Sequence, residues 1–199
     1  PMVLRAFAHA LEPFRPMLTP EQLFLRLGAP PERTFLELLE NEAHVPEAMR
    51  RLEAYSDTHW HLITAFDGVH PFFERLRTAG RELALWTGRD RGSSEVILRE
   101  QRLETVLREV VCGDDLPTHK PHPEGLLEIM CRLAVAPEQT LYVGDADVDV
   151  LAGSEVGVRT VLIRHGRMVD PVIAGKAWRV VESPTDAYAL VGTLVTELV

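Results

Sequence analysis

Hydrophobic and polar positions follow two different periodicities along the chain. From Leu4 to Leu11 the apolar residues fall at i, i+3, i+4 and i+7. This spacing predicts an amphipathic helix, because it places the apolar side chains on one face. After Gly68 the pattern changes to short apolar runs separated by amphipathic segments. We therefore expect a helical region up to about residue 68 and a different architecture after it.

The second region reads as strands that alternate with helices. Its apolar runs are "ELALWT" (82–87), "REVVC" (108–112), "TLYVG" (140–144) and "RTVLIR" (159–164). The amphipathic segments cover 70–79, 91–101, 123–133 and 148–156, and a last one follows the capping sequence that begins at Ser183. Buried strands alternating with helices of about ten residues predict a doubly wound parallel α/β sheet.

Polar residues lie at, or shortly after, the carboxyl ends of three of these predicted strands. Thr87 ends the first run, Lys120 follows the second, and Asp145 comes directly after the third. Ligands of such sheets bind beyond the carboxyl ends of the strands, where these side chains converge. Each residue also has a structural explanation: Thr87 as a helix cap, Lys120 as a solvated surface lysine, and Asp145 as an N-cap. Their coincidence at one edge favours a ligand site.

Charge and composition limit the kinds of partner. Thirty acidic residues against 21 Lys and Arg give a net charge of −9, which disfavours nucleic acid. A phosphorylated ligand therefore needs a site that is locally cationic or holds a metal ion. No apolar run is long enough for a membrane span, and the N-terminal residues do not resemble a secretion signal. Together with two widely spaced cysteines, these features predict a cytoplasmic protein with no membrane partner.

Three ordered motifs resemble a known family. "LALWTGRD", "KPHPE" and "LYVGDADVD" are similar in order and spacing to the second, third and fourth motifs of the haloacid dehalogenase-like (HAD) hydrolase superfamily, nearest to its phosphoglycolate phosphatase-like branch. The resemblance implies a Rossmannoid α/β catalytic core at 67–199 with a small helical cap at 1–66.

One motif of the family has no counterpart here. Its first motif, D-x-D-G-T, ends the first strand and supplies the nucleophilic and the acid/base aspartates, and it is absent from the sequence. The resemblance places that strand in the centre of the sheet, between 82–87 and 140–144. We expect about 15–20 residues upstream of Pro1, the length of a strand and its following loop. Without them we expect no turnover.

The matched positions acquire roles by the same resemblance. Asp145 would be a ligand of Mg²⁺, a hard cation that prefers carboxylate oxygens and water. Asp149 would either complete the metal site or orient Lys120. Thr87, the Gly88 N–H and Lys120 would bind the phosphoryl oxygens and stabilise their charge in the transition state.

Asp147 and Arg89 are two further charged residues next to these positions. Asp147 is two residues from Asp145 and points elsewhere on the helix, so we assign it to the helix N-terminus, where the macrodipole favours negative charge. Arg89 is either a phosphate contact or a surface arginine in an ion pair.

These assignments predict a Mg²⁺-dependent phosphatase that hydrolyses a small phosphorylated metabolite through an aspartyl-phosphate intermediate. Phosphoglycolate, pyrophosphate and a sugar phosphate are the candidate substrates, and the protein would be a monomer or a homodimer. A 2-haloacid dehalogenase is an alternative that the acids of "GDADVD" disfavour, since they suit a cation. A non-catalytic phosphate-binding protein is the second alternative, because the nucleophile motif is absent.

Overall fold

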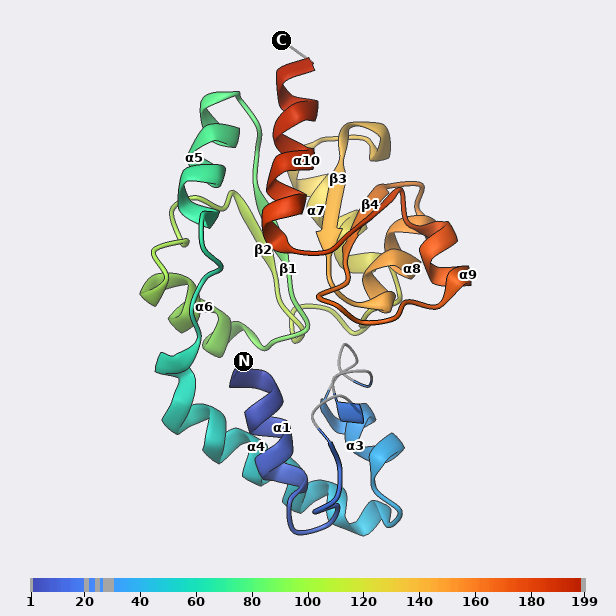
Figure 1. Cartoon of the computed structure of the whole chain (residues 1–199). Helices are drawn as coiled ribbons and strands as arrows, with labels where there is room; N and C mark the ends of the chain where they lie inside the picture. The colour runs from blue at the N-terminus through green and yellow to red at the C-terminus, as the bar shows by residue number, and fades with distance from the viewer. Residues whose placement is uncertain (1, 20–21, 24–25, 27–30, 198–199) are drawn as a thin grey trace. The chain divides into compact units, whose positions relative to one another are not determined.

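The computed structural model describes residues 2–19, 22–23, 26 and 31–197. The chain forms two compact units, Pro1–Thr64 and Ala65–Val199 (Figure 1). The family resemblance placed the boundary after residue 66, and the structural division comes slightly earlier. Within the described residues, no helix is both long enough and apolar enough to cross a membrane.

The described residues of the first unit form helices joined by turns. They are α1 (Met2–Leu11), α3 (Pro31–Leu38), the 3₁₀ turn η1 (Glu42–His44), α4 (Val45–His59) and the 3₁₀ turn η2 (Trp60–Leu62). Helix α1 packs along α4, and the ring centroids of Phe7 and Phe35 lie 5.2 Å apart in the core. Leu11 at the end of the predicted stripe is 1% exposed. Phe7 of the stripe is buried too, but Ala8 is exposed and Ala10 is buried instead. The buried face of the helix therefore overlaps the predicted stripe without coinciding with it.

The second unit alternates helices and strands. Its elements are α5 (Val69–Thr78), β1 (Ala84–Trp86), α6 (Arg91–Glu100), β2 (Glu109–Val111), α7 (Glu124–Leu133), η3 (Pro137–Gln139), β3 (Leu141–Gly144), α8 (Asp147–Glu155), β4 (Arg159–Ile163), α9 (Pro171–Lys176), β5 (Arg179–Val181) and α10 (Pro184–Glu197). All strand pairs are parallel. The prediction of a parallel α/β fold is confirmed, although α9 and β5 were not expected.

The strands form two separate parallel sheets. Strand β1 pairs with β2, with Leu85 opposite Val110, and the other sheet has the order β3-β4-β5, with Val143 opposite Val161. Strands β1 and β3 do not pair with each other, so each presents one edge without backbone partners from the described strands. Val143 is 39% exposed. A central strand of a doubly wound sheet is normally buried on both faces, so β3 is less covered than its position in such a fold implies.

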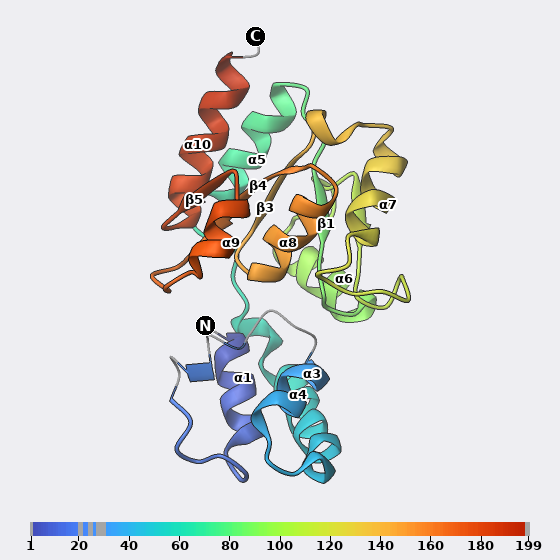
Figure 2. The same ribbon diagram turned by 90° about the vertical axis from the view of Figure 1, so that its right-hand side faces the viewer.

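Side chains hold the two sheets together on both faces. One cluster contains Leu83 and Leu141 under α5 and α10, and the other contains Trp86 and Tyr142 under α7. Neighbouring positions in a strand point to opposite faces, which explains why Leu141 and Tyr142 join different clusters. In Figure 2, α10 and α7 lie on opposite sides of the strands. The unit is therefore covered by helices on both faces.

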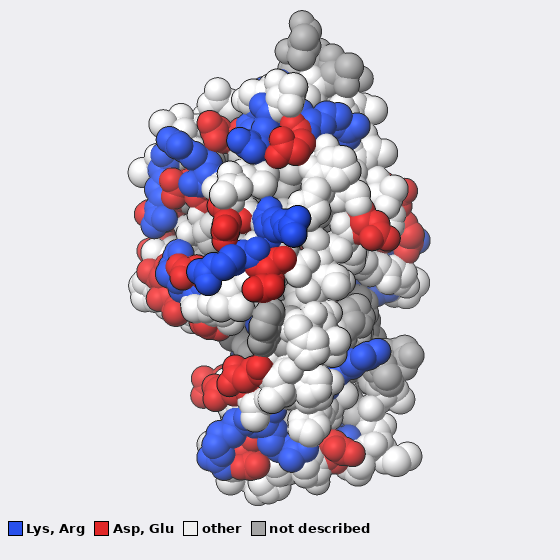
Figure 3. All heavy atoms as spheres, turned by 90° about the vertical axis from the view of Figure 1, so that its left-hand side faces the viewer, with Lys and Arg blue, Asp and Glu red and all other residues white. Residues whose placement is uncertain are grey.

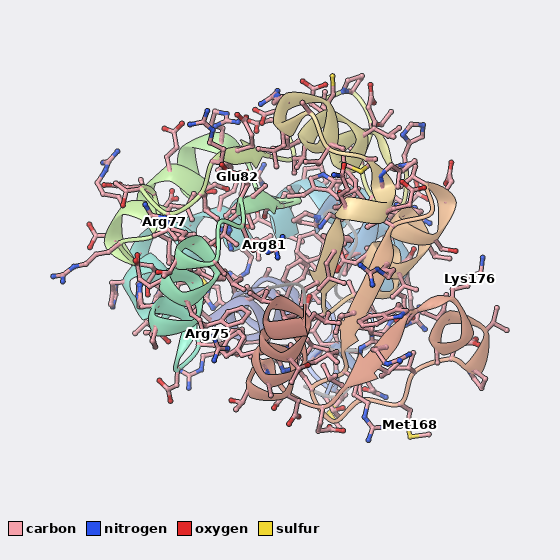
Figure 4. The ribbon with its side chains drawn as sticks, turned by 90° about the horizontal axis from the view of Figure 1, so that it is seen from above. Arg75, Arg77, Arg81, Glu82, Met168 and Lys176 are labelled. Carbon is pink, nitrogen blue, oxygen red and sulfur yellow. The ribbon has the colours of Figure 1, made fainter. Side chains whose placement is uncertain are left out.

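Arg75 joins the two helices of the first face. Its guanidinium stacks over the ring of Phe72 at 5.6 Å and donates to the carbonyl oxygen of Tyr188 at 3.4 Å. Seen from above, Arg75 extends from α5 toward α10, whereas Met168 lies at the periphery of the unit (Figure 4). This contact holds the C-terminal helix α10 against α5, the helix that precedes β1.

Candidate active site

The polar residues predicted at the strand ends do meet at one edge. Lys120, on the connection between β2 and α7, donates from Nζ to Oδ1 of Asp149 at 2.8 Å and to the carbonyl oxygen of Trp86 at 3.0 Å. Trp86 ends β1 and Asp149 lies in the first turn of α8, directly beyond β3. One ammonium group therefore links the carboxyl ends of β1 and β3.

The Lys120 ammonium is enclosed by aromatic rings as well as by oxygen atoms. Its Nζ lies 4.6 Å from the ring centroid of Trp86 and 5.5 Å from that of Tyr142. Only 15% of its side chain is exposed. Aromatic faces attract cations electrostatically, most strongly where water is excluded. The alternative that Lys120 is a solvated surface lysine is therefore wrong, and its charge is held in a fixed position.

Asp149 uses both of its carboxylate oxygens within the fold. Oδ1 accepts from Lys120 and from the hydroxyl of Tyr142 at 2.6 Å, while Oδ2 accepts from the backbone N–H of Asp145 at 3.2 Å and of Ala146 at 3.0 Å. These four donors occupy both oxygens of the carboxylate. This geometry supports the role of orienting Lys120 and gives no support to Asp149 as a metal ligand.

Tyr142 was not anticipated from the sequence. Burial raises the pKa of its hydroxyl well above the usual value, and the negative charge of Asp149 raises it further. The hydroxyl therefore stays protonated and remains a donor to Asp149. The only local signal was its alternating position in the strand "TLYVG", which indicates a buried face but not a partner.

Gly144 is required by the close approach of Asp149. A Cβ at this position would overlap the carboxylate of Asp149. We expect Gly144→Ala to lower the free energy of unfolding by about 1–3 kcal/mol, as overpacking usually does, because the Asp149 carboxylate must move away from Lys120. Urea unfolding would measure the change. Gly175→Ala in α9 is the control, since nothing lies within 4 Å of its added Cβ. Similar losses in both variants would contradict this explanation.

Asp145 differs from Asp149 because its side chain faces solvent. Two thirds of it, 66%, is exposed, and Nε2 of the His165 imidazole lies 3.9 Å from its Oδ2. Partial loss of hydration beside the protein raises the pKa of Asp145, and the charge of Asp149 raises it further. Asp145 is therefore the carboxylate of this edge that is open to a ligand.

Asp147 has a specific partner that the sequence did not reveal. Its Oδ1 lies 2.6 Å from Nη2 of Arg167, whose side chain is 11% exposed. The assignment of Asp147 to the N-terminus of a helix is confirmed, since α8 begins there. The main electrostatic partner of Asp147 is, however, Arg167 and not the helix macrodipole. Arg167 lies on the connection after β4 and forms an ion pair with Asp147.

Thr87 and Gly88 lie at the turn after β1. The Thr87 hydroxyl oxygen accepts from the Arg89 N–H at 3.1 Å, while helix α6 is capped by Asp90, which accepts from the Ser93 N–H at 2.8 Å. The alternative that Thr87 caps this helix is therefore wrong. Its hydroxyl hydrogen can still be donated to a ligand, because the oxygen acts as the acceptor in this turn.

Arg89 lies beside this turn and is half-buried. Burial lowers the pKa of its guanidinium, and the neighbouring charge of Asp90 opposes that shift. A half-buried arginine at the end of a strand is better placed for an anion than one extended into water. Both assignments for Arg89 stay predictions.

Comparisons with known proteins agree with this geometry. The family model described as haloacid dehalogenase-like hydrolase matches residues 1–163. Phosphoglycolate phosphatase 1 of Pseudomonas aeruginosa is 36% identical over 115 residues, which cover 58% of this chain and 42% of that protein. The pyrophosphatase PpaX of Anoxybacillus flavithermus is 28% identical over 160 residues, which cover 80% of this chain and 74% of that protein. The chain thus covers less than half the length of the first of these relatives.

Solved structures share the fold. A hydrolase from Pseudomonas syringae superposes with a TM-score of 0.80 over 96% of this chain and 91% of that chain, at 18% sequence identity. An identity this low indicates a common architecture and carries no information on substrate.

Proposed function

Because the chain belongs to the haloacid dehalogenase-like hydrolase family, we propose that its second unit is the core of a Mg²⁺-dependent phosphatase that acts on a small phosphorylated metabolite. The observation that carries this proposal is the enclosed Lys120 ammonium. Asp149 holds it where β1 and β3 end, close in sequence to the open carboxylate of Asp145. A fixed cation beside a site for a second cation suits a phosphate dianion.

The carboxylate at this edge fits Mg²⁺ as one of several ligands. Mg²⁺ usually takes one or two carboxylates and completes its octahedron with water and substrate phosphate. Asp145 is such a carboxylate, whereas Asp149 has no free oxygen. The described residues contain no group of three or more His, Cys, Asp or Glu arranged to hold a metal ion. Asp145 would therefore be one ligand among waters and phosphate oxygens.

The residues around the site would act on the phosphoryl group. Lys120, the Thr87 hydroxyl and the Gly88 N–H would each contact phosphoryl oxygens and stabilise charge that builds up in the transition state. The ammonium costs little to orient during the reaction, because Asp149 and the Trp86 carbonyl already hold it. When bound, the metal would offset the repulsion between the dianion and an anionic nucleophile.

The nucleophile is proposed to lie on a strand between β1 and β3. Both strands present an edge without described strand partners, and Lys120 links their carboxyl ends. An aspartate at the end of such a strand would attack phosphorus through a carboxylate oxygen, and the ester P–O bond would break as the alcohol leaves. Water would then hydrolyse the aspartyl-phosphate to inorganic phosphate and the free carboxylate.

We further propose that the helical unit is the cap of the active site and recognises the rest of the substrate. Its expected extent is 1–66. Arg26 and Arg33, in the stretch "RLGAPPERTF" (26–35), are the basic residues that could contact the part of the substrate other than phosphate. Arg33 forms an ion pair with Glu37 on the helix surface at 3.4 Å. This ion pair favours a structural role for Arg33 over contact with substrate.

The substrate would be a small anion, with phosphoglycolate and pyrophosphate suggested by the names of the relatives. Basic and acidic side chains are intermixed on the face shown in Figure 3, so attraction of an anion would depend on the local site. Cys112 and Cys131 are free cysteines, which suits a cytoplasmic protein. We propose no nucleic-acid or membrane partner, and a monomer or a homodimer.

Hydrolysis of p-nitrophenyl phosphate by the protein with its natural N-terminus tests the proposal. We expect turnover that depends on Mg²⁺ and disappears when EDTA is added, because the dianion needs a second cation beside Lys120. Release of halide from 2-chloropropionate without metal would instead support the dehalogenase. Phosphate binding without turnover of either compound would support the non-catalytic alternative.

A further inference from the structure

The turn after β4 has a fixed conformation. The N–H of Arg167 donates to the carbonyl oxygen of Arg164 at 2.9 Å, and the N–H groups of Arg164 and His165 continue the pairing of β4 with the segment that starts at β5. His165 and Gly166 have φ of 49° and 78°, the left-handed conformation that closes such a turn. The direction in which the turn presents its side chains is therefore set by the sheet.

Arg167 extends from this turn to the loop that follows β3. Its Nη2 donates to the carbonyl oxygen of Asp145 at 3.0 Å and lies 2.6 Å from Oδ1 of Asp147. That Oδ1 atom is buried and accepts no aligned hydrogen bond, so the positive charge of Arg167 is its main compensation. One nitrogen atom thus contacts two residues of the loop, although the arginine comes from the turn after β4.

The same turn approaches Asp145 through a second residue. The imidazole of His165 lies 3.9 Å from the Asp145 carboxylate, and its ring stacks on Phe66 with centroids 5.6 Å apart. Backbone and side chain of Asp145 therefore both have neighbours on the turn after β4. The contact of Arg167 with the backbone carbonyl of Asp145 is shorter than the contact of His165 with its carboxylate.

Each acid of "GDADVD" thus has a different environment. Asp149 is paired with Lys120, Asp147 is paired with Arg167, and Asp145 has only the more distant His165. Arg167 removes Asp147 as a competing carboxylate and anchors the peptide group of Asp145. The remaining open carboxylate is held at the end of β3 before any cation arrives.

We propose that Arg167 is a positioning residue for the metal ligand Asp145, an inference that rests on the proposed function of this site. Its loss would free the Asp145 carbonyl and the Asp147 carboxylate, so that metal binding must also order the loop. Partners that orient metal ligands typically contribute about 10–100-fold in metal affinity. The effect should appear in metal affinity and much less in turnover at saturating metal.

Matched arginine variants of one turn test this proposal. In the protein with its natural N-terminus, Mn²⁺ affinity would be measured by electron paramagnetic resonance for wild type, Arg167→Met, Arg167→Lys and Arg164→Met. We expect Arg167→Met to weaken Mn²⁺ binding about tenfold and Arg167→Lys to restore most of it. Arg164 pairs with Glu182 at 2.5 Å and is 45% exposed, so Arg164→Met should bind Mn²⁺ as wild type does.

The activity arm separates this inference from the proposed function. We expect Arg167→Met to need about tenfold more Mg²⁺ for half-maximal hydrolysis of p-nitrophenyl phosphate, with kcat at saturating Mg²⁺ within about threefold of wild type. Wild-type Mn²⁺ affinity in a folded Arg167→Met would overturn the inference, and so would equal weakening in Arg164→Met. Should Arg167→Met not fold, Arg167→Gln takes its place with the same criteria. Mn²⁺ binding without hydrolysis in wild type would refute the phosphatase alone, and no Mn²⁺ binding in wild type would refute both.

Discussion

We expect this fold to be an active phosphatase when a strand that ends in aspartate pairs with both β1 and β3. We expect residues 1–199 alone to show no hydrolysis above background. A chain extended upstream by about 15–20 residues should hydrolyse p-nitrophenyl phosphate at an ordinary enzyme rate of about 1–10³ per second. The physical reason is that β1 and β3 share no backbone hydrogen bonds, while both end beside Lys120.

The same extension should stabilise the protein. Each backbone hydrogen bond that the strand makes to β1 or β3 contributes about 0.5–1.5 kcal/mol net. It should also cover Val143, which is 39% exposed. Urea unfolding of the two chains would therefore differ by several kcal/mol, a large part of the usual stability of about 5–15 kcal/mol for a domain.

A variant of the extended chain separates the strand from the nucleophile. Replacing the aspartate at the end of the added strand by asparagine should keep the gain in stability and abolish turnover. Ordinary turnover by residues 1–199 alone would show that the proposed position of the nucleophile is wrong. An extension that restores activity without changing stability would show that it does not pair with β1 and β3.

The second large effect is expected for Asp145→Asn. Loss of its charge removes the one open carboxylate of the site, so kcat should fall by about 10²–10³, the usual range for a group that stabilises the transition state electrostatically. The Mg²⁺ concentration needed for half-maximal activity should rise as well. Steady-state kinetics at varied Mg²⁺ would measure both changes. The side chain is exposed, so we expect only a small change in the unfolding midpoint.

Asp114→Asn is the matched control for this variant. Asp114 follows β2 as Asp145 follows β3, and its carboxylate accepts from the backbone N–H of Arg91 at 2.8 Å. We expect its kcat to stay within about twofold of wild type, because its carboxylate accepts from the backbone before α6 and is not part of the Lys120–Asp149 ion pair. Asp147→Asn would be a poor control, because it also breaks the ion pair with Arg167. Equal losses of activity in the Asp145 and Asp114 variants would refute the special role of Asp145.

Much of the site was predictable because its residues occupy characteristic places in the chain. Thr87 ends one apolar run and Asp145 directly follows another, and the carboxyl ends of parallel strands meet at one edge. The partners of these residues were not predictable in the same way. Tyr142 and Trp86 appear in the sequence as ordinary strand residues, and nothing in the local pattern shows that their rings enclose Lys120.

The sequence by itself determined the positions of most elements, the parallel α/β architecture and the edge at which the polar residues gather. These features depend on periodicity and on the order of segments, which are local properties of the chain. The tertiary structure decided that the strands form two sheets, that Asp149 is saturated while Asp145 is open, and that Arg167 holds Asp147. The ion pairs of Asp149 with Lys120 and of Asp147 with Arg167 join residues about 20 or more positions apart, and such contacts leave no periodic signal in the sequence. The other three donors to Asp149 lie within seven positions of it, but the sequence pattern does not show which groups its side chain reaches.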